Sequence, residues 1–170
     1  MNAENRRQAI LTLLSQSDAP VSAGTLASRF SVSRQIIVGD IALLRAAGAD
    51  ISATPRGYTV PREQEGLLRT VACVHTKEQT EQELNIMVDN GCAVLDVVVE
   101  HPIYGQMTGQ LQLSSRYDVA QFMERLRTAW GAPLSALTDG IHLHTLRCPD
   151  EAAYRRTCDQ LRAAGLLLNT

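Results

Sequence analysis

The sequence has 170 residues, of which 45% are hydrophobic, 20% charged and 4% aromatic. This composition is typical of a soluble globular protein, and so few aromatic residues argue against a stacking platform for single-stranded nucleic acid. No apolar run approaches the length of a membrane-spanning helix and residues 1–7 lack a signal core, so we expect a cytoplasmic protein without membrane partners. The net charge is −2, but residues 1–62 carry +3 and residues 63–170 carry −5, which indicates two modules.

Residues 1–62 predict a winged helix-turn-helix domain. Apolar residues recur at helical spacing in three segments, residues 4–17, 23–30 and 34–47. Ser22 and Ser33 are the expected N-caps of the second and third helices, and Gly48 ends the third. Two short helices joined by a tight turn form the helix-turn-helix pattern, and the strand, turn and strand expected within residues 49–60 predict the wing.

The start of the third helix is the expected reading element for double-stranded operator DNA. It presents Ser33, Arg34 and Gln35. Arginine suits guanine and glutamine suits adenine as bidentate partners in the major groove. Arg45 and Arg56, the latter at the tip of the wing, are candidate phosphate contacts. A module that binds another protein instead of DNA, or an accessory domain of an enzyme, is the alternative for this unit.

Residues 19–45 closely resemble the winged-helix module of many bacterial repressors. The resemblance includes the Val-Ser-Arg sequence at residues 32–34 and the Asp-Ile-x-x-Leu-Arg sequence at residues 40–45. Gly39 departs from that pattern, in which a polar residue is commoner, and a helical glycine costs about 1 kcal/mol relative to alanine. Its missing side chain is expected to permit a close approach of the helix backbone to DNA.

Residues 63–170 predict an α+β sandwich, and the polar segment 61–66 marks the boundary before it. Strands are expected at residues 67–75, 93–99, 105–114 and 141–147, and helices at residues 76–90, 117–130 and 150–164. The order is β-α-β-β-α-β-α. With a central strand at residues 93–99 and an edge strand at residues 105–114, this order indicates helices on one face of a sheet.

The histidines give the second module its candidate chemistry. His142 and His144 alternate on one strand, so both imidazoles point to one face and can reach one ion. His75 ends another strand, and Glu83 lies about two turns into the helix that follows. Three histidines and a carboxylate suit Zn²⁺ or Ni²⁺. Two ordinary strand histidines on a solvated face are the alternative, and Cys73 is a competing ligand.

Three segments resemble the three-histidine (3H) domain of NiaR-type repressors of NAD biosynthesis and nicotinate uptake. They are residues 74–76 with the following Glu83, residues 96–105, and residues 140–145. The resemblance extends over nearly the whole chain. It implies a repressor and not an enzyme, with nicotinic acid as co-repressor and a divalent metal bound by His75, Glu83, His142 and His144.

His101, Tyr104 and Arg116 are candidate contacts for the effector. His101 precedes Pro102, so its backbone is extended, and it is either a pocket residue or a structural histidine bonded to the backbone. We expect nicotinate to complete the coordination of the metal. The nicotinate-bound form should be a homodimer that binds DNA, with two recognition helices in major grooves about 34 Å apart.

Two other functions are compatible with these residues. A metal-dependent amide hydrolase with an accessory DNA-binding domain would need a free general base, for which Glu100 and Asp139 are candidates. A metal-responsive repressor would instead use the ion itself as its effector.

Overall fold

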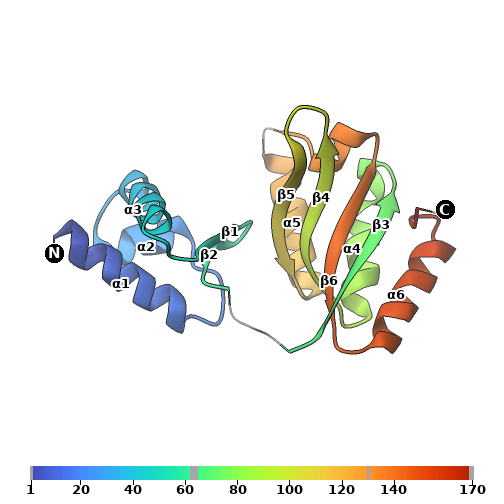
Figure 1. Cartoon of the computed structure of the whole chain (residues 1–170), viewed down its shortest axis with the longest axis horizontal. Coiled ribbons are helices and arrows are strands. Elements are labelled where there is room, and N and C mark those ends of the chain that lie inside the picture. Colours follow the sequence, from blue (N-terminus) through green and yellow to red (C-terminus); the bar gives the residue numbers. More distant parts are fainter. Residues whose placement is uncertain (1, 62–64, 130, 169–170) are drawn as a thin grey trace. The chain divides into compact units, whose positions relative to one another are not determined.

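The structure, a computed structural model, describes residues 2–61, 65–129 and 131–168 (Figure 1). The chain divides into two compact units, residues 1–63 and residues 64–170. The boundary expected between residues 62 and 63 lies outside the described residues. Within the described ranges, no helix is both long enough and apolar enough to cross a membrane.

The first unit is a winged helix-turn-helix. Its elements are α1 (Ala3–Gln16), α2 (Ala23–Phe30), α3 (Arg34–Ala46), β1 (Ser52–Thr54) and β2 (Gly57–Thr59), the two strands pairing as an antiparallel hairpin. Ser22 and Ser33 act as N-caps, because their side chains accept the N–H groups of Thr25 and Ile36 at 3.0 and 3.3 Å. Ser31 has a left-handed backbone, with φ of 53°, which keeps the turn between α2 and α3 short.

The wing is attached to the helices by backbone hydrogen bonds. The Val21 N–H donates to the Tyr58 carbonyl oxygen at 2.8 Å, and the Tyr58 N–H donates to the Val21 oxygen at 2.9 Å. Gly57 has φ of +137°, and a Cβ there would lie 2.4 Å from the Val21 oxygen. Glycine is therefore required where the hairpin meets the segment before α2.

A partly buried ion pair joins α1 to α3. The Nε of Arg6 lies 2.6 Å from Oδ2 of Asp40, whose side chain is 4% exposed. An apolar core holds the same helices together, formed by Ile10, Leu14, Ala23, Leu26, Ile37, Ile41, Leu44 and Ile51. Because α3 turns one side toward this core, the opposite side, which includes Gln35, Gly39 and Ala42, faces solvent.

The second unit confirms the expected α+β fold and element order. Its strands are β3 (Leu67–Val74), β4 (Ala93–His101), β5 (Gly105–Leu113) and β6 (Ile141–Cys148), and its helices are α4 (Thr80–Asp89), α5 (Arg116–Thr128) and α6 (Glu151–Ala163). Two short 3-10 helices, η1 (Lys77–Gln79) and η2 (Leu134–Thr138), precede α4 and β6. The sheet is antiparallel in the order β3-β6-β4-β5, so β4 is central and β5 is an edge, as the sequence predicts.

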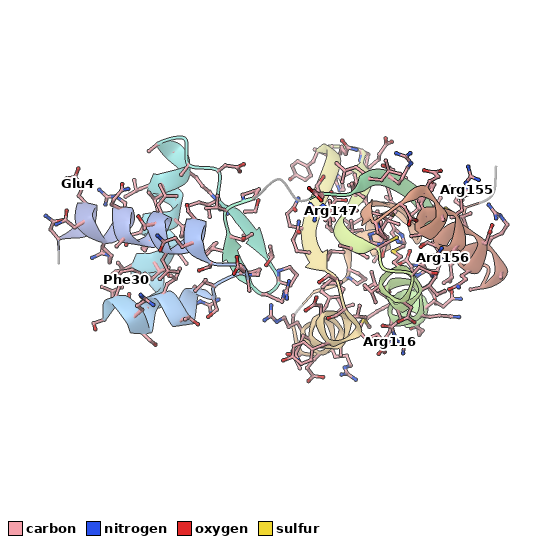
Figure 2. All side chains as sticks on the ribbon, turned by 90° about the horizontal axis from the view of Figure 1, so that it is seen from below. Glu4, Phe30, Arg116, Arg147, Arg155 and Arg156 are labelled. Atoms are coloured by element: carbon pink, nitrogen blue, oxygen red, sulfur yellow. The ribbon has the colours of Figure 1, made fainter. Side chains whose placement is uncertain are left out.

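Helices α4, α5 and α6 cover one face of this sheet (Figures 1 and 2). Strand β6 shows which side chains meet them, because its residues are alternately buried and less buried along the whole strand. The buried positions at its end are Leu146 and Cys148, which belong to the apolar core. The buried positions at its start are His142 and His144. The core therefore changes from apolar to polar at the end where β6 begins.

Candidate functional site

Four predicted side chains converge at the polar end of the core. Strands β3 and β6 are antiparallel neighbours in which Cys73 pairs with His142, so His75, just beyond β3, lies on the same face as His142 and His144. Helix α4 covers this face and turns Glu83 inward, where it is 1% exposed. The structure thus brings together the three histidines and the acidic residue that sequence spacing suggested.

Each imidazole is oriented by a backbone carbonyl group. The three Nδ1 distances are 2.8 Å for His75 to Thr76 O, 2.8 Å for His142 to Gly140 O, and 2.6 Å for His144 to Asp96 O. A carbonyl oxygen can only accept a hydrogen bond, so each Nδ1 carries a proton and donates it. Carbonyl groups fix metal-binding histidines in this way, with Nε2 left to face the ion.

The three Nε2 atoms surround one carboxylate. Nε2 of His75 lies 2.7 Å and Nε2 of His144 lies 3.3 Å from Oε2 of Glu83, and Nε2 of His142 lies 3.0 Å from Oε1. With its proton on Nδ1, a neutral imidazole presents only a lone pair at Nε2, and a carboxylate oxygen also presents lone pairs. The buried Nε2 of His75 in fact has no hydrogen bond of acceptable geometry. The arrangement therefore requires positive charge at its centre, from imidazolium protons or from a metal ion.

Burial and charge together set the pKa values in this cluster. Burial acts to raise the pKa of Glu83, but the charge of His144, hydrogen bonds with His142 and His144, and the close approach of His75 hold it well below its usual value. Burial acts to lower the pKa of both His75 and His144, but hydrogen bonding and charge from Glu83, with help from backbone carbonyls, raise both. The carboxylate is therefore ionised and its surroundings favour cations.

The cluster has the donor types and the spacing of a metal site. Ligands about 2.0–2.1 Å from a tetrahedral ion lie about 3.3 Å apart, comparable with the separations between the imidazoles and Glu83. Cys73 is also close, since its Sγ, a Glu83 oxygen and a His142 nitrogen all lie within 4.8 Å of one another. Burial and the charge of Glu83 raise the pKa of Cys73 far above its usual value, which favours the neutral thiol in metal-free protein.

His101 and Tyr104 lie at the β4–β5 hairpin and contact each other. Nδ1 of His101 accepts the N–H groups of Ile103 and Tyr104 at 3.2 and 3.4 Å, and the two rings have centroids 5.0 Å apart. This is the backbone-bonded arrangement that was the alternative for His101. An effector contact by either residue stays a prediction.

Arg116 is not brought to the histidines. It begins α5, and its guanidinium donates to both oxygens of Asp89 at 2.7 and 2.5 Å (Figure 2). Asp89 is the last residue of α4, whereas Glu83 lies in the first turns of that helix. The ion pair with Asp89 therefore explains why Arg116 lies away from the pocket in which the sequence placed it.

A cavity of about 390 Å³ opens beside His75. It is lined by Val74, His75, Thr76, Lys77, Gln79, Pro133, Ser135, Ala136, Asp139 and Gly140. Gly140 has φ of +89°, and a Cβ there would lie 2.4 Å from the His75 carbonyl oxygen, so the turn before β6 presses directly on this histidine. Sequence reasoning missed the cavity because η2 has no amphipathic repeat. The Asp139-Gly140 pair was an available turn signal.

The exposed side of α3 carries the residues predicted to contact DNA and one further candidate, Val38. Ser33 caps the helix, and Arg34 and Gln35 are exposed beside it. Val38 lies one turn after Arg34 and is 41% exposed, although it is apolar. An exposed apolar side chain on such a helix suits the methyl group of thymine. A Cβ on Gly39 would meet no atom within 4 Å, so the fold does not require glycine there.

Arg45 and Arg56 have structural contacts in the wing. Nε of Arg45 donates to the Ile51 carbonyl oxygen at 2.8 Å, and its guanidinium lies 5.8 Å from the centre of the Tyr58 ring. The Arg56 N–H donates to Oγ1 of Thr54 at 3.2 Å, and the residue is partly buried. Phosphate contacts by these two arginines stay predictions.

The fold and the histidine cluster define a helix-turn-helix protein with a second, α+β domain that buries three histidines around one carboxylate. Family models agree, since an HTH domain matches residues 6–59 and a 3H domain matches residues 68–170. The chain belongs to the 3H-domain family of NiaR-type transcription repressors.

Two relatives match it over almost their full lengths. The chain is 42% identical over 168 residues to the transcription repressor NadR of Bacillus subtilis (strain 168). This match covers 96% of this chain and 93% of the relative. It is also 42% identical over 165 residues to the probable transcription repressor NiaR of Thermotoga maritima, with 97% and 94% covered.

Proposed function

We propose that this protein represses genes of NAD biosynthesis or nicotinate uptake, with nicotinic acid as co-repressor. The first unit binds operator DNA through the start of α3. The second unit holds Zn²⁺ or Ni²⁺ through His75, Glu83, His142 and His144 and keeps a coordination position open for the effector. Nicotinate acts by binding more tightly to the DNA-binding arrangement of a homodimer, since a ligand shifts an equilibrium only by its differential affinity.

One observation carries the metal part of this proposal. Three imidazoles, each with Nδ1–H donated to a carbonyl oxygen, direct their Nε2 atoms at one ionised and buried carboxylate. Holding three imidazolium groups in a buried site is costly, because burial disfavours each charged form. A single divalent cation supplies the missing charge and makes every Nε2 lone pair a ligand.

The same observation weakens the hydrolase alternative. Glu83 is surrounded by three imidazoles and by the thiol of Cys73, so it is not available as a general base. Asp139 lines the cavity and is the remaining described candidate near His75. Turnover of nicotinamide by the purified protein would support the hydrolase.

The proposal is tested by the binding of a duplex from the protein's own upstream region, followed by fluorescence anisotropy at fixed salt. We expect nicotinate to tighten binding of metal-loaded protein, chelation to abolish that response, and Zn²⁺ or Ni²⁺ to restore it. Binding that follows metal concentration and ignores nicotinate would favour the metal-responsive repressor. Absence of any salt-dependent binding to duplex DNA would rule out the DNA-binding role.

A matched pair of variants on one helix isolates the metal cluster. Glu83→Gln removes the central charge, and we expect it to abolish the response to nicotinate, as should His142→Ala. Glu81→Gln makes the same change on the solvent-exposed side of α4 and should retain the response. Equal responses from Glu83→Gln and Glu81→Gln would show that the cluster is not part of the sensor.

A further inference from the structure

The cavity beside His75 contains the single lysine of the protein. The other 15 basic residues are arginines, and Lys77 lies in η1, two residues after His75. Lys77 is exposed, so its ammonium can reach solvent at the mouth of the cavity. The volume, about 390 Å³, falls within the range of small-molecule sites. A small ligand therefore has both room and one positive charge at this position.

The remaining lining sets the chemistry of a ligand. Val74, Pro133 and Ala136 provide apolar surface, which suits a small ring. Asp139 contributes one negative charge, so the lining holds an acidic group as well as Lys77. A ligand with one negative charge can pair with Lys77 and keep away from Asp139, whereas a phosphorylated ligand with several negative charges would be repelled.

We propose that this cavity binds a small aromatic monocarboxylate, with Lys77 pairing with its carboxylate group. The inference rests on the proposed function, for which it gives the place and charge selectivity of nicotinate binding. His75 belongs both to the cavity and to the histidine cluster, so a ligand in the cavity touches the residue that also faces Glu83. Asp139 disfavours nicotinic acid mononucleotide, and nicotinamide lacks the charge that Lys77 recognises.

The single lysine makes a direct test possible. Reductive methylation of the full-length, metal-loaded protein with ¹³C-formaldehyde labels Lys77 and the N-terminal amine, and it preserves the positive charge. In NMR spectra we expect nicotinate to shift the Lys77 signal saturably, and benzoate to shift it as well. Nicotinamide and nicotinic acid mononucleotide should need at least about tenfold higher concentrations, because each loses or opposes the charge pairing.

Calorimetry on variants supplies the second measurement. Lys77→Gln should weaken nicotinate binding at least about tenfold. Arg155→Gln removes one positive charge from the exposed face of α6 and should bind nicotinate as the natural protein does. Far-ultraviolet circular dichroism of each variant verifies that it is folded.

The outcomes separate the two levels of the proposal. If nicotinate binds and tightens DNA binding equally in the natural protein and in Lys77→Gln, the cavity assignment is wrong and the repressor function stands. If nicotinate neither binds nor affects DNA binding, the proposed effector is wrong. In that case a saturable shift of the Lys77 signal by benzoate would still support a monocarboxylate cavity, and no shift would refute it.

Discussion

Replacing Gly39 with alanine should stabilise the fold and weaken DNA binding at the same time. The added Cβ meets no atom within 4 Å, and the residue lies inside α3, so only helix propensity changes in the free protein. We therefore expect a gain of about 1 kcal/mol in the free energy of unfolding of the first unit. For a unit of this size that corresponds to roughly 4–8 °C in melting temperature.

The effect on DNA has the opposite sign. Gly39 shares the solvent-facing side of α3 with Gln35, and a methyl group there would keep the backbone from its closest approach to the major groove. We expect about a tenfold loss of affinity for the upstream duplex, measured by anisotropy, and the stability is measured by hydrogen exchange of α1–α3 in the full chain. Gly24→Ala in α2 is the control, since its Cβ makes only an ordinary contact, 3.7 Å from Oγ of Ser22. Unchanged affinity in Gly39→Ala would refute the close approach.

Three further predictions follow from the contacts. Gly140→Ala forces a Cβ to 2.4 Å from the His75 carbonyl oxygen, so it should lower metal affinity by roughly 10-fold or more in a competition assay. Asp40→Asn removes the negative charge that pairs with Arg6 and should lower the urea midpoint of the first unit. In metal-free protein His75 and His144 have raised pKa values. The protonated imidazoles therefore add to the free energy of unfolding in full below about pH 6.5, and this contribution is lost as the pH rises through the raised pKa values. Metal-loaded protein should instead gain stability over that range, because protons compete with the ion, and melting curves at several pH values distinguish the two slopes.

Local patterns account for most of the fold that could be predicted. The caps at Ser22 and Ser33 and the alternation along β6 follow from rules that span a few residues, and the structure reproduces them. The Thr76 capping box also forms, but a 3-10 turn follows it, so α4 begins only at Thr80. The pairing of β6 between β3 and β4 joins segments far apart in the chain, and no local pattern determines such a register.

In the candidate site, too, local spacing predicts some residues and long-range contacts determine the others. His142 and His144 could be placed on one face because they are two residues apart on a strand. The positions of His75 at a strand end and of Glu83 in the next helix made them candidates, and the family resemblance implied the same four residues. The position of Arg116 could not be predicted, because it depends on an ion pair with Asp89, which lies 27 residues earlier in the chain. The cavity was missed for a similar reason, since its two walls come from segments about 60 residues apart.

X-ray absorption at the metal edge of the full-length protein loaded with Zn²⁺ or Ni²⁺ shows directly whether the histidine cluster holds the ion. We expect one tightly held ion per chain, with imidazole nitrogen and carboxylate oxygen scatterers at about 2.0–2.2 Å. We also expect no sulfur scatterer, because His75, Glu83, His142 and His144 are the proposed ligands and Cys73 is not among them. A sulfur shell at about 2.3 Å, or protein that retains no ion after dialysis, would contradict this expectation.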